Sequence, residues 1–96
     1  MLTFDKLLLL AADWDDVAIS NTPNCVVFVH NQTFLVIRPM KAALDVKFYS
    51  ASPLTGLTPY KSLIYSGRYA NHFRISKLED ITPIMIRYIR ESYELL

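Results

Sequence analysis

The sequence predicts a single α+β domain over residues 1–96, with one helix at each end and a mainly antiparallel sheet of about five strands between them. Near both ends, apolar residues recur at helical spacing, whereas in the middle they alternate or form short β-branched runs. Ninety-six residues suffice for one domain and not for two, and 52% hydrophobic residues can build a core without a metal or disulfide. We expect the C-terminal helix to pack on the sheet.

Residues 3–12 are predicted to form the first helix, because Leu7 and Ala11 fall on one face. Leu9 and Leu10 widen this apolar stripe, so we expect the helix to be buried on more than one side. The apolar run is far shorter than the ~20 residues that cross a bilayer. We therefore expect no export signal, no membrane partner and a cytoplasmic location.

The next part of the chain predicts a three-stranded antiparallel meander over residues 25–30, 33–38 and 43–49. Asn31 suits the first turn, since asparagine tolerates the left-handed conformation. Alternating residues 17–19 allow a further strand ahead of the meander. In the last of the three strands, the alternation directs Asp45, Lys47 and Tyr49 away from the core.

Residues 51–60 contain two prolines and a glycine and are predicted to be a loop. A short strand over residues 61–66 and another over 69–75 follow. In the second of these, alternation directs Phe73 to one face of the sheet, and His72 and Arg74 to the other.

Thr82 and Pro83 begin the last helix, as a capping hydroxyl followed by a proline at the first helical position. Just before it, residues 76–79 have the spacing of a capping box. Met85 and Ile89 lie on the apolar stripe of the helix, which faces the sheet.

The two middle strands are apolar on both faces, which is unusual for an antiparallel sheet. Val27 and Val29 point away from Val26 and Phe28. Two short helices cover roughly one face of a small sheet. We therefore expect the second face to meet a partner, either another protein or a second copy of this chain.

The sequence contains no catalytic, cofactor-binding or metal-binding motif that we can identify, so we expect neither an enzyme nor a cofactor. Cys25 is the single cysteine, which excludes an intramolecular disulfide. The aspartates at positions 13, 15 and 16 fit a solvated turn better than a calcium loop. The net charge of +1 argues against a general polyanion binder.

Residues 60–90 combine basic and aromatic side chains, the pairing that single-stranded nucleic-acid sites use. The candidate contacts for a ligand or nucleic acid are Arg68, His72, Arg74 and Lys77. The alternative interpretation is that these charges form a solvated surface over ordinary core residues.

The segments from Gly67 to Ile75, Leu78 to Ile81 and Ile89 to Glu94 carry a family resemblance. The chain resembles the bacterial domain of unknown function numbered five-six-five-five, whose members are often called predicted transport proteins. The likeness is strongest over residues 67–94. Asn71 precedes His72 where members usually have two consecutive histidines. The family implies no catalytic residues, and its likeness to accessories of restriction or nuclease systems implies a nucleic-acid role by analogy.

These observations favour a small intracellular interaction module without enzymatic activity that self-associates through an apolar sheet face, as a homodimer. The alternative is a nucleic-acid-binding accessory of a restriction or nuclease system.

Overall fold

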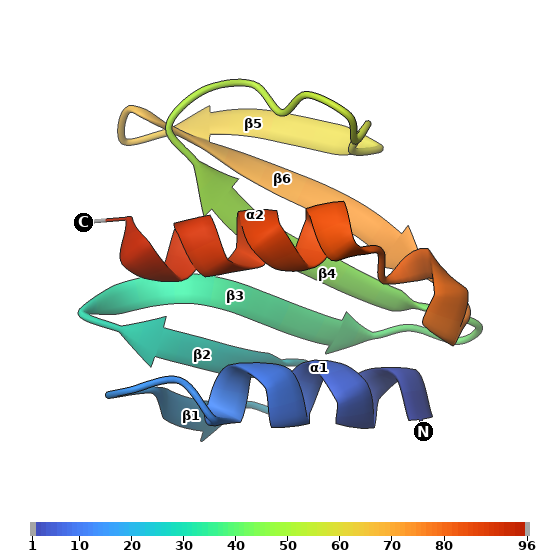
Figure 1. Ribbon diagram of the computed structural model, residues 1–96. Helices are drawn as coiled ribbons and strands as arrows, with labels where there is room; N and C mark the ends of the chain where they lie inside the picture. Colours follow the sequence, from blue (N-terminus) through green and yellow to red (C-terminus); the bar gives the residue numbers. More distant parts are fainter. Residues whose placement is uncertain (1, 96) are drawn as a thin grey trace.

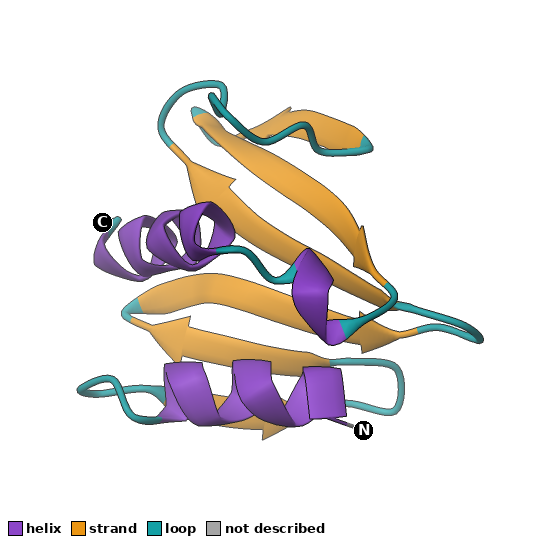
Figure 2. Ribbon diagram, turned by 45° about the vertical axis from the view of Figure 1, so that its right-hand side comes forward, coloured by secondary structure: helices purple, strands orange, loops and turns teal. Residues whose placement is uncertain are grey.

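The computed structural model describes residues 2–95 as a six-stranded antiparallel sheet with two helices on one of its faces (Figures 1 and 2). The elements in chain order are α1 (Leu2–Ala12), β1 (Ala18–Asn21), β2 (Val26–His30), β3 (Gln32–Pro39), β4 (Leu44–Ser50), β5 (Lys61–Tyr65), β6 (Arg68–Ile75), the short 3-10 helix η1 (Leu78–Asp80) and α2 (Pro83–Glu94). The predicted α+β architecture is confirmed, with six strands rather than about five.

The strand order is β1-β2-β3-β4-β6-β5. Strands β1 to β4 form a meander, and β5 and β6 form a hairpin in which β6, not β5, pairs with β4. The predicted turn at Asn31 is confirmed, with φ at 64°. Ser66 and Gly67 both have positive φ and close the β5–β6 hairpin as a two-residue turn between Tyr65 and Arg68.

One irregularity in β3 shapes the centre of the fold. Phe28 pairs with Leu35 but Val29 pairs with Thr33, so Phe34 is an extra residue in its strand. Phe34 and Leu35 are both buried as a result. The ring of Phe34 lies 5.9 Å from the ring of Trp14, which follows α1, and 5.3 Å from the ring of Tyr93 in α2. These contacts join the sheet to both helices.

The core lies between the sheet and the two helices. Its strand residues come from alternate positions except at the β3 bulge, where two consecutive residues are buried. The remaining core residues come from α1, from α2 and from the turn between η1 and α2. The whole set is Leu7, Ala11, Phe28, Phe34, Leu35, Ile37, Leu44, Val46, Phe48, Phe73, Ile75, Ile81, Met85, Ile89 and Tyr93. The expectation that α1 is buried on more than one side is wrong. Leu9 is 70% exposed, because the sheet covers only the side of α1 that carries Leu7 and Ala11.

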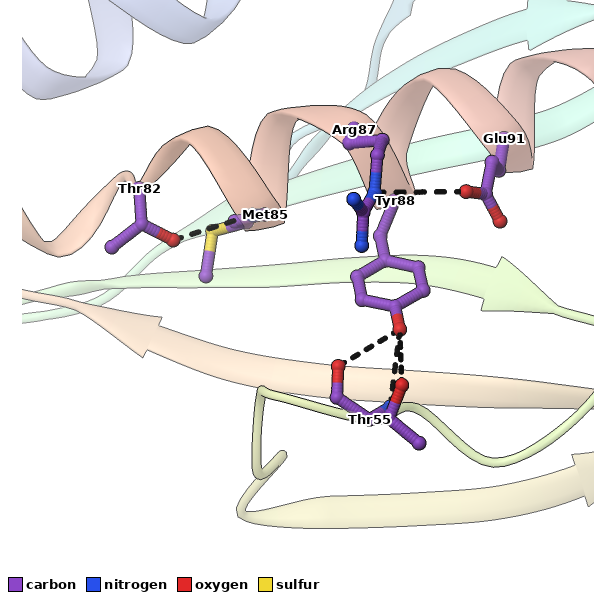
Figure 3. A network of polar contacts seen from close by, with 6 residues as sticks. All are labelled: Thr55, Thr82, Met85, Arg87, Tyr88 and Glu91. Atoms are coloured by element: carbon purple, nitrogen blue, oxygen red, sulfur yellow. Dashed lines mark hydrogen bonds and ion pairs between the residues drawn. The ribbon is translucent and has the colours of Figure 1, made fainter.

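Helix α2 begins as predicted, since the Thr82 hydroxyl accepts a hydrogen bond from the Met85 amide at 3.2 Å (Figure 3). The preceding turn differs from the capping box expected over residues 76–79. The carboxylate of this turn comes from Asp80 and not from Glu79. It accepts hydrogen bonds from the backbone amides of Ser76 and Lys77. These two hydrogen bonds lower the pKa of Asp80.

Tyr88 on α2 anchors the loop that leads into β5 (Figure 3). Its hydroxyl donates to the Thr55 carbonyl at 2.8 Å and accepts from the Thr55 amide at 3.1 Å. Because this loop ends at Tyr60, the anchor helps to determine where Tyr60 meets the sheet.

Candidate functional site

The face of the sheet that carries no helix is the candidate site, and we call it the open face (Figures 1 and 2). Strand registers define its residues, because paired residues share a face. On β2 and β3 it carries Val27, Val29, Val36 and Arg38, and on β4 it carries Asp45, Lys47 and Tyr49. On β5 and β6 it carries Lys61, Leu63, Arg68, Ala70, His72 and Arg74.

Positive charge is concentrated on the open face. Five of the ten basic residues of the chain lie there (Arg38, Lys47, Lys61, Arg68 and Arg74), against one of its nine acidic residues, Asp45. The remaining acidic residues lie outside the strands, in or near the helices and turns. A chain of net charge +1 therefore presents a strongly basic surface that extends from the Arg38 end of β3 across β4, β6 and β5.

The one acidic residue of this face is already hydrogen-bonded. Asp45 is only 7% exposed, and it lies between Arg38 and Arg74 in the strand register. The Tyr60 hydroxyl donates to its Oδ1, and Nδ1 of His72 lies 3.2 Å from its Oδ2. The hydrogen bond to Asp45 and partial burial raise the pKa of Tyr60 above its ordinary value, so the phenol remains protonated and acts as the donor.

Two tyrosine rings interleave with the basic side chains. The guanidinium of Arg68 lies 4.9 Å from the centre of the Tyr49 ring, and the Lys47 amine lies 5.7 Å from it. The guanidinium of Arg74 lies 4.7 Å from the centre of the Tyr60 ring. These cation–π contacts hold the cations against the sheet and reduce the freedom of their long side chains.

A cavity of about 300 Å³ opens on the same face. Its walls are Lys47, Tyr49, Leu63, Ala70 and His72, which come from three adjacent strands. It therefore combines an ammonium group, an imidazole and a phenol with an apolar wall.

Three of the four predicted contact residues lie together. Arg68, His72 and Arg74 share the open face of β6, as their even spacing requires. Lys77 lies beyond the end of β6, at the start of η1, where its amide bonds Asp80. The possibility that Lys77 contacts a ligand stays a prediction.

Sequence reasoning missed the contribution of β4. Alternation directed Asp45, Lys47 and Tyr49 outward, but nothing local indicated that they lie beside His72 rather than beside β5. Covariation between positions 45 and 72 is the signal that would have identified the pair, since it reports spatial contact.

Other site chemistry is sparse in the part of the chain that the structure describes. Over residues 2–95, no three histidine, cysteine, aspartate or glutamate side chains lie close enough to hold a metal ion. No helix within those residues is both long and apolar enough to cross a bilayer.

Comparison with known proteins identifies the family. The family described as Domain of unknown function (DUF5655) matches residues 1–96. That description mentions no transport role, so the transport label implied by the resemblance stays a prediction. No curated protein and no solved structure matches the chain. Since the match extends from the first residue to the last, this chain belongs to the DUF5655 family of domains of unknown function.

Proposed function

We propose that this domain is a non-enzymatic binding module that holds single-stranded nucleic acid across the open face of its sheet. The observation that carries the proposal is the charge distribution, five basic residues against one acidic residue on that face. Phosphate neutralisation by lysine and arginine supplies most of the affinity in such complexes. The acidic residue opposes it little, because the Asp45 carboxylate is buried and hydrogen-bonded.

Two further features favour a single strand over a duplex. Tyr49 and Tyr60 lie among the cations, and aromatic rings on an open sheet stack with unpaired bases. Leu63 of β5 is 53% exposed and lines a cavity with Tyr49, so it offers an additional apolar surface for a base. In a duplex the bases are stacked on one another, so the tyrosine rings would find no free base face to stack on.

The test is the salt dependence of binding to a fluorescent single-stranded oligonucleotide. The triple variant Lys47→Gln, Arg68→Gln and Arg74→Gln removes three positive charges but retains much of each side chain. We expect the slope of log affinity against log salt to fall by about 2, since each single-strand phosphate contact contributes ~0.7.

A matched control removes three charges elsewhere, by Lys6→Gln, Lys41→Gln and Arg87→Gln. These side chains are exposed, and none belongs to the open face. The control should retain the wild-type slope. Equal losses in both triple variants would indicate a general charge effect and contradict the proposal, as would the absence of binding at low salt.

Self-association is the second candidate function, and a different part of the surface favours it. Val27, Val29 and Val36 occupy the open face over β2 and β3, where neither helix covers them. At the edge of the sheet, Ile64 of β5 is 73% exposed. An uncovered apolar face and an exposed edge strand are both surfaces that proteins commonly bury against a second copy.

A further inference from the structure

The hydrogen bonds of Asp45 determine which nitrogen of His72 can accept a hydrogen bond. An ionised carboxylate only accepts hydrogen bonds, and Asp45 receives one from the Tyr60 hydroxyl and one from His72. When the imidazole is neutral, the contact at 3.2 Å therefore assigns its single ring hydrogen to Nδ1. The other ring nitrogen, Nε2, keeps its lone pair and is an acceptor.

This acceptor has a cation beside it. Lys47 and His72 are direct partners in the β4–β6 register, so their Cβ atoms lie about 5 Å apart on the same face. Both side chains line the cavity of about 300 Å³, with Ala70 and Leu63 as its apolar wall. Two residues that line one cavity from adjacent strands thus supply a hydrogen-bond acceptor and a positive charge.

A ribonucleotide carries the complementary pair of groups. Its 2′-hydroxyl can donate a hydrogen bond, and its 3′-phosphate is bonded to the adjacent carbon of the sugar. We propose that the cavity is a ribose subsite, in which Nε2 of His72 accepts the 2′-hydroxyl and the Lys47 amine binds the neighbouring phosphate. The domain therefore prefers RNA to DNA, an inference that rests on the proposed nucleic-acid function. The 2′-hydroxyl is the group by which proteins distinguish the two polymers.

Three octamers of the same base test this subsite on the unmodified protein: oligouridine, oligodeoxyuridine and 2′-O-methyl oligouridine. The methylated strand retains the 2′-oxygen but cannot donate its hydrogen. We expect oligouridine to bind about three- to tenfold more tightly than either of the others, which is the range for one net hydrogen bond. Fluorescence anisotropy at one fixed salt concentration measures all three affinities.

The outcomes separate the subsite from the proposed function. Equal affinity for the three octamers overturns the ribose subsite and leaves the nucleic-acid function standing. If oligouridine and its methylated form both bind more tightly than oligodeoxyuridine, the subsite is also overturned. The preference would then follow the sugar conformation rather than the hydrogen-bond donor of the 2′-hydroxyl. If none of the three binds at low salt, the nucleic-acid function itself is wrong.

A variant locates the effect. His72→Phe retains a planar ring but removes Nε2. The variant should therefore bind oligouridine and oligodeoxyuridine with equal affinity. Far-ultraviolet circular dichroism of the variant detects misfolding, and the comparison between the two octamers is made on the folded variant itself. A variant that still prefers oligouridine would overturn the role of Nε2.

Discussion

Ser92 joins α2 to the irregular part of the sheet, and its removal gives a stringent test of the packing. Its hydroxyl donates to the Phe34 carbonyl at 2.7 Å and accepts from the Tyr49 amide at 2.9 Å. Phe34 and Tyr49 are the residues that would pair next after Leu35 and Phe48 in a regular ladder. The serine hydroxyl therefore replaces a backbone hydrogen bond where β3 bulges.

Replacing Ser92 by Ala should cost about 2–4 kcal/mol of unfolding free energy. The side chain is only 2% exposed, so water cannot replace the lost hydroxyl without disturbing the core. A buried group left without its hydrogen bond costs ~1–3 kcal/mol, and here one donor and one acceptor are both affected. Partial closing of β3 onto β4 would recover some of the loss, which is why we expect less than the maximum of about 6 kcal/mol.

Urea denaturation followed by circular dichroism measures this cost from the midpoint at constant slope. Ser20→Ala is the matched control, because Ser20 is exposed on the edge strand β1, and its loss should change stability by no more than ~0.5 kcal/mol. If Ser92→Ala costs as little as the control, the hydroxyl bridge is not a structural link and the description of the bulge is wrong.

The remaining predictions concern the core, the Asp45 cluster and self-association. Phe34→Ala should cost ~3–5 kcal/mol by the same denaturation assay, since the ring is buried; a cost near zero would move Phe34 to an exposed position. Because the pKa of Tyr60 is raised in the folded state, its contribution to stability is complete below about pH 10 and is lost as the pH rises through the folded pKa. Urea unfolding between about pH 8 and 11 should show a steeper loss for the unmodified protein than for Tyr60→Phe, and parallel curves would contradict the hydrogen bond to Asp45. Light scattering at micromolar concentration should give about twice the 11.1 kDa chain mass, and a monomer at every concentration would remove self-association as a function.

Local patterns in the sequence were sufficient to predict most elements of the fold. The β-branched runs and the alternation of Leu44, Val46 and Phe48 with polar neighbours identify the strands, because a pleated strand exposes successive side chains on opposite faces. The cap at Thr82 and the left-handed turn at Asn31 depend on a few neighbouring residues. The same alternation directed His72 and Arg74 to one side of β6, which is the side that became the open face.

Long-range pairing decided what the candidate site contains. Asp45 looks like an ordinary outward residue in its strand, yet it is buried because Tyr60 and His72 contact it from 15 and 27 positions further along the chain. The basic surface arises in the same way. Its charges are diluted along the sequence and gather only because β6 inserts between β4 and β5, while both helices pack on the opposite face. Side-chain alternation is a local property of the backbone, whereas the choice of neighbouring strand depends on burying the whole core at once.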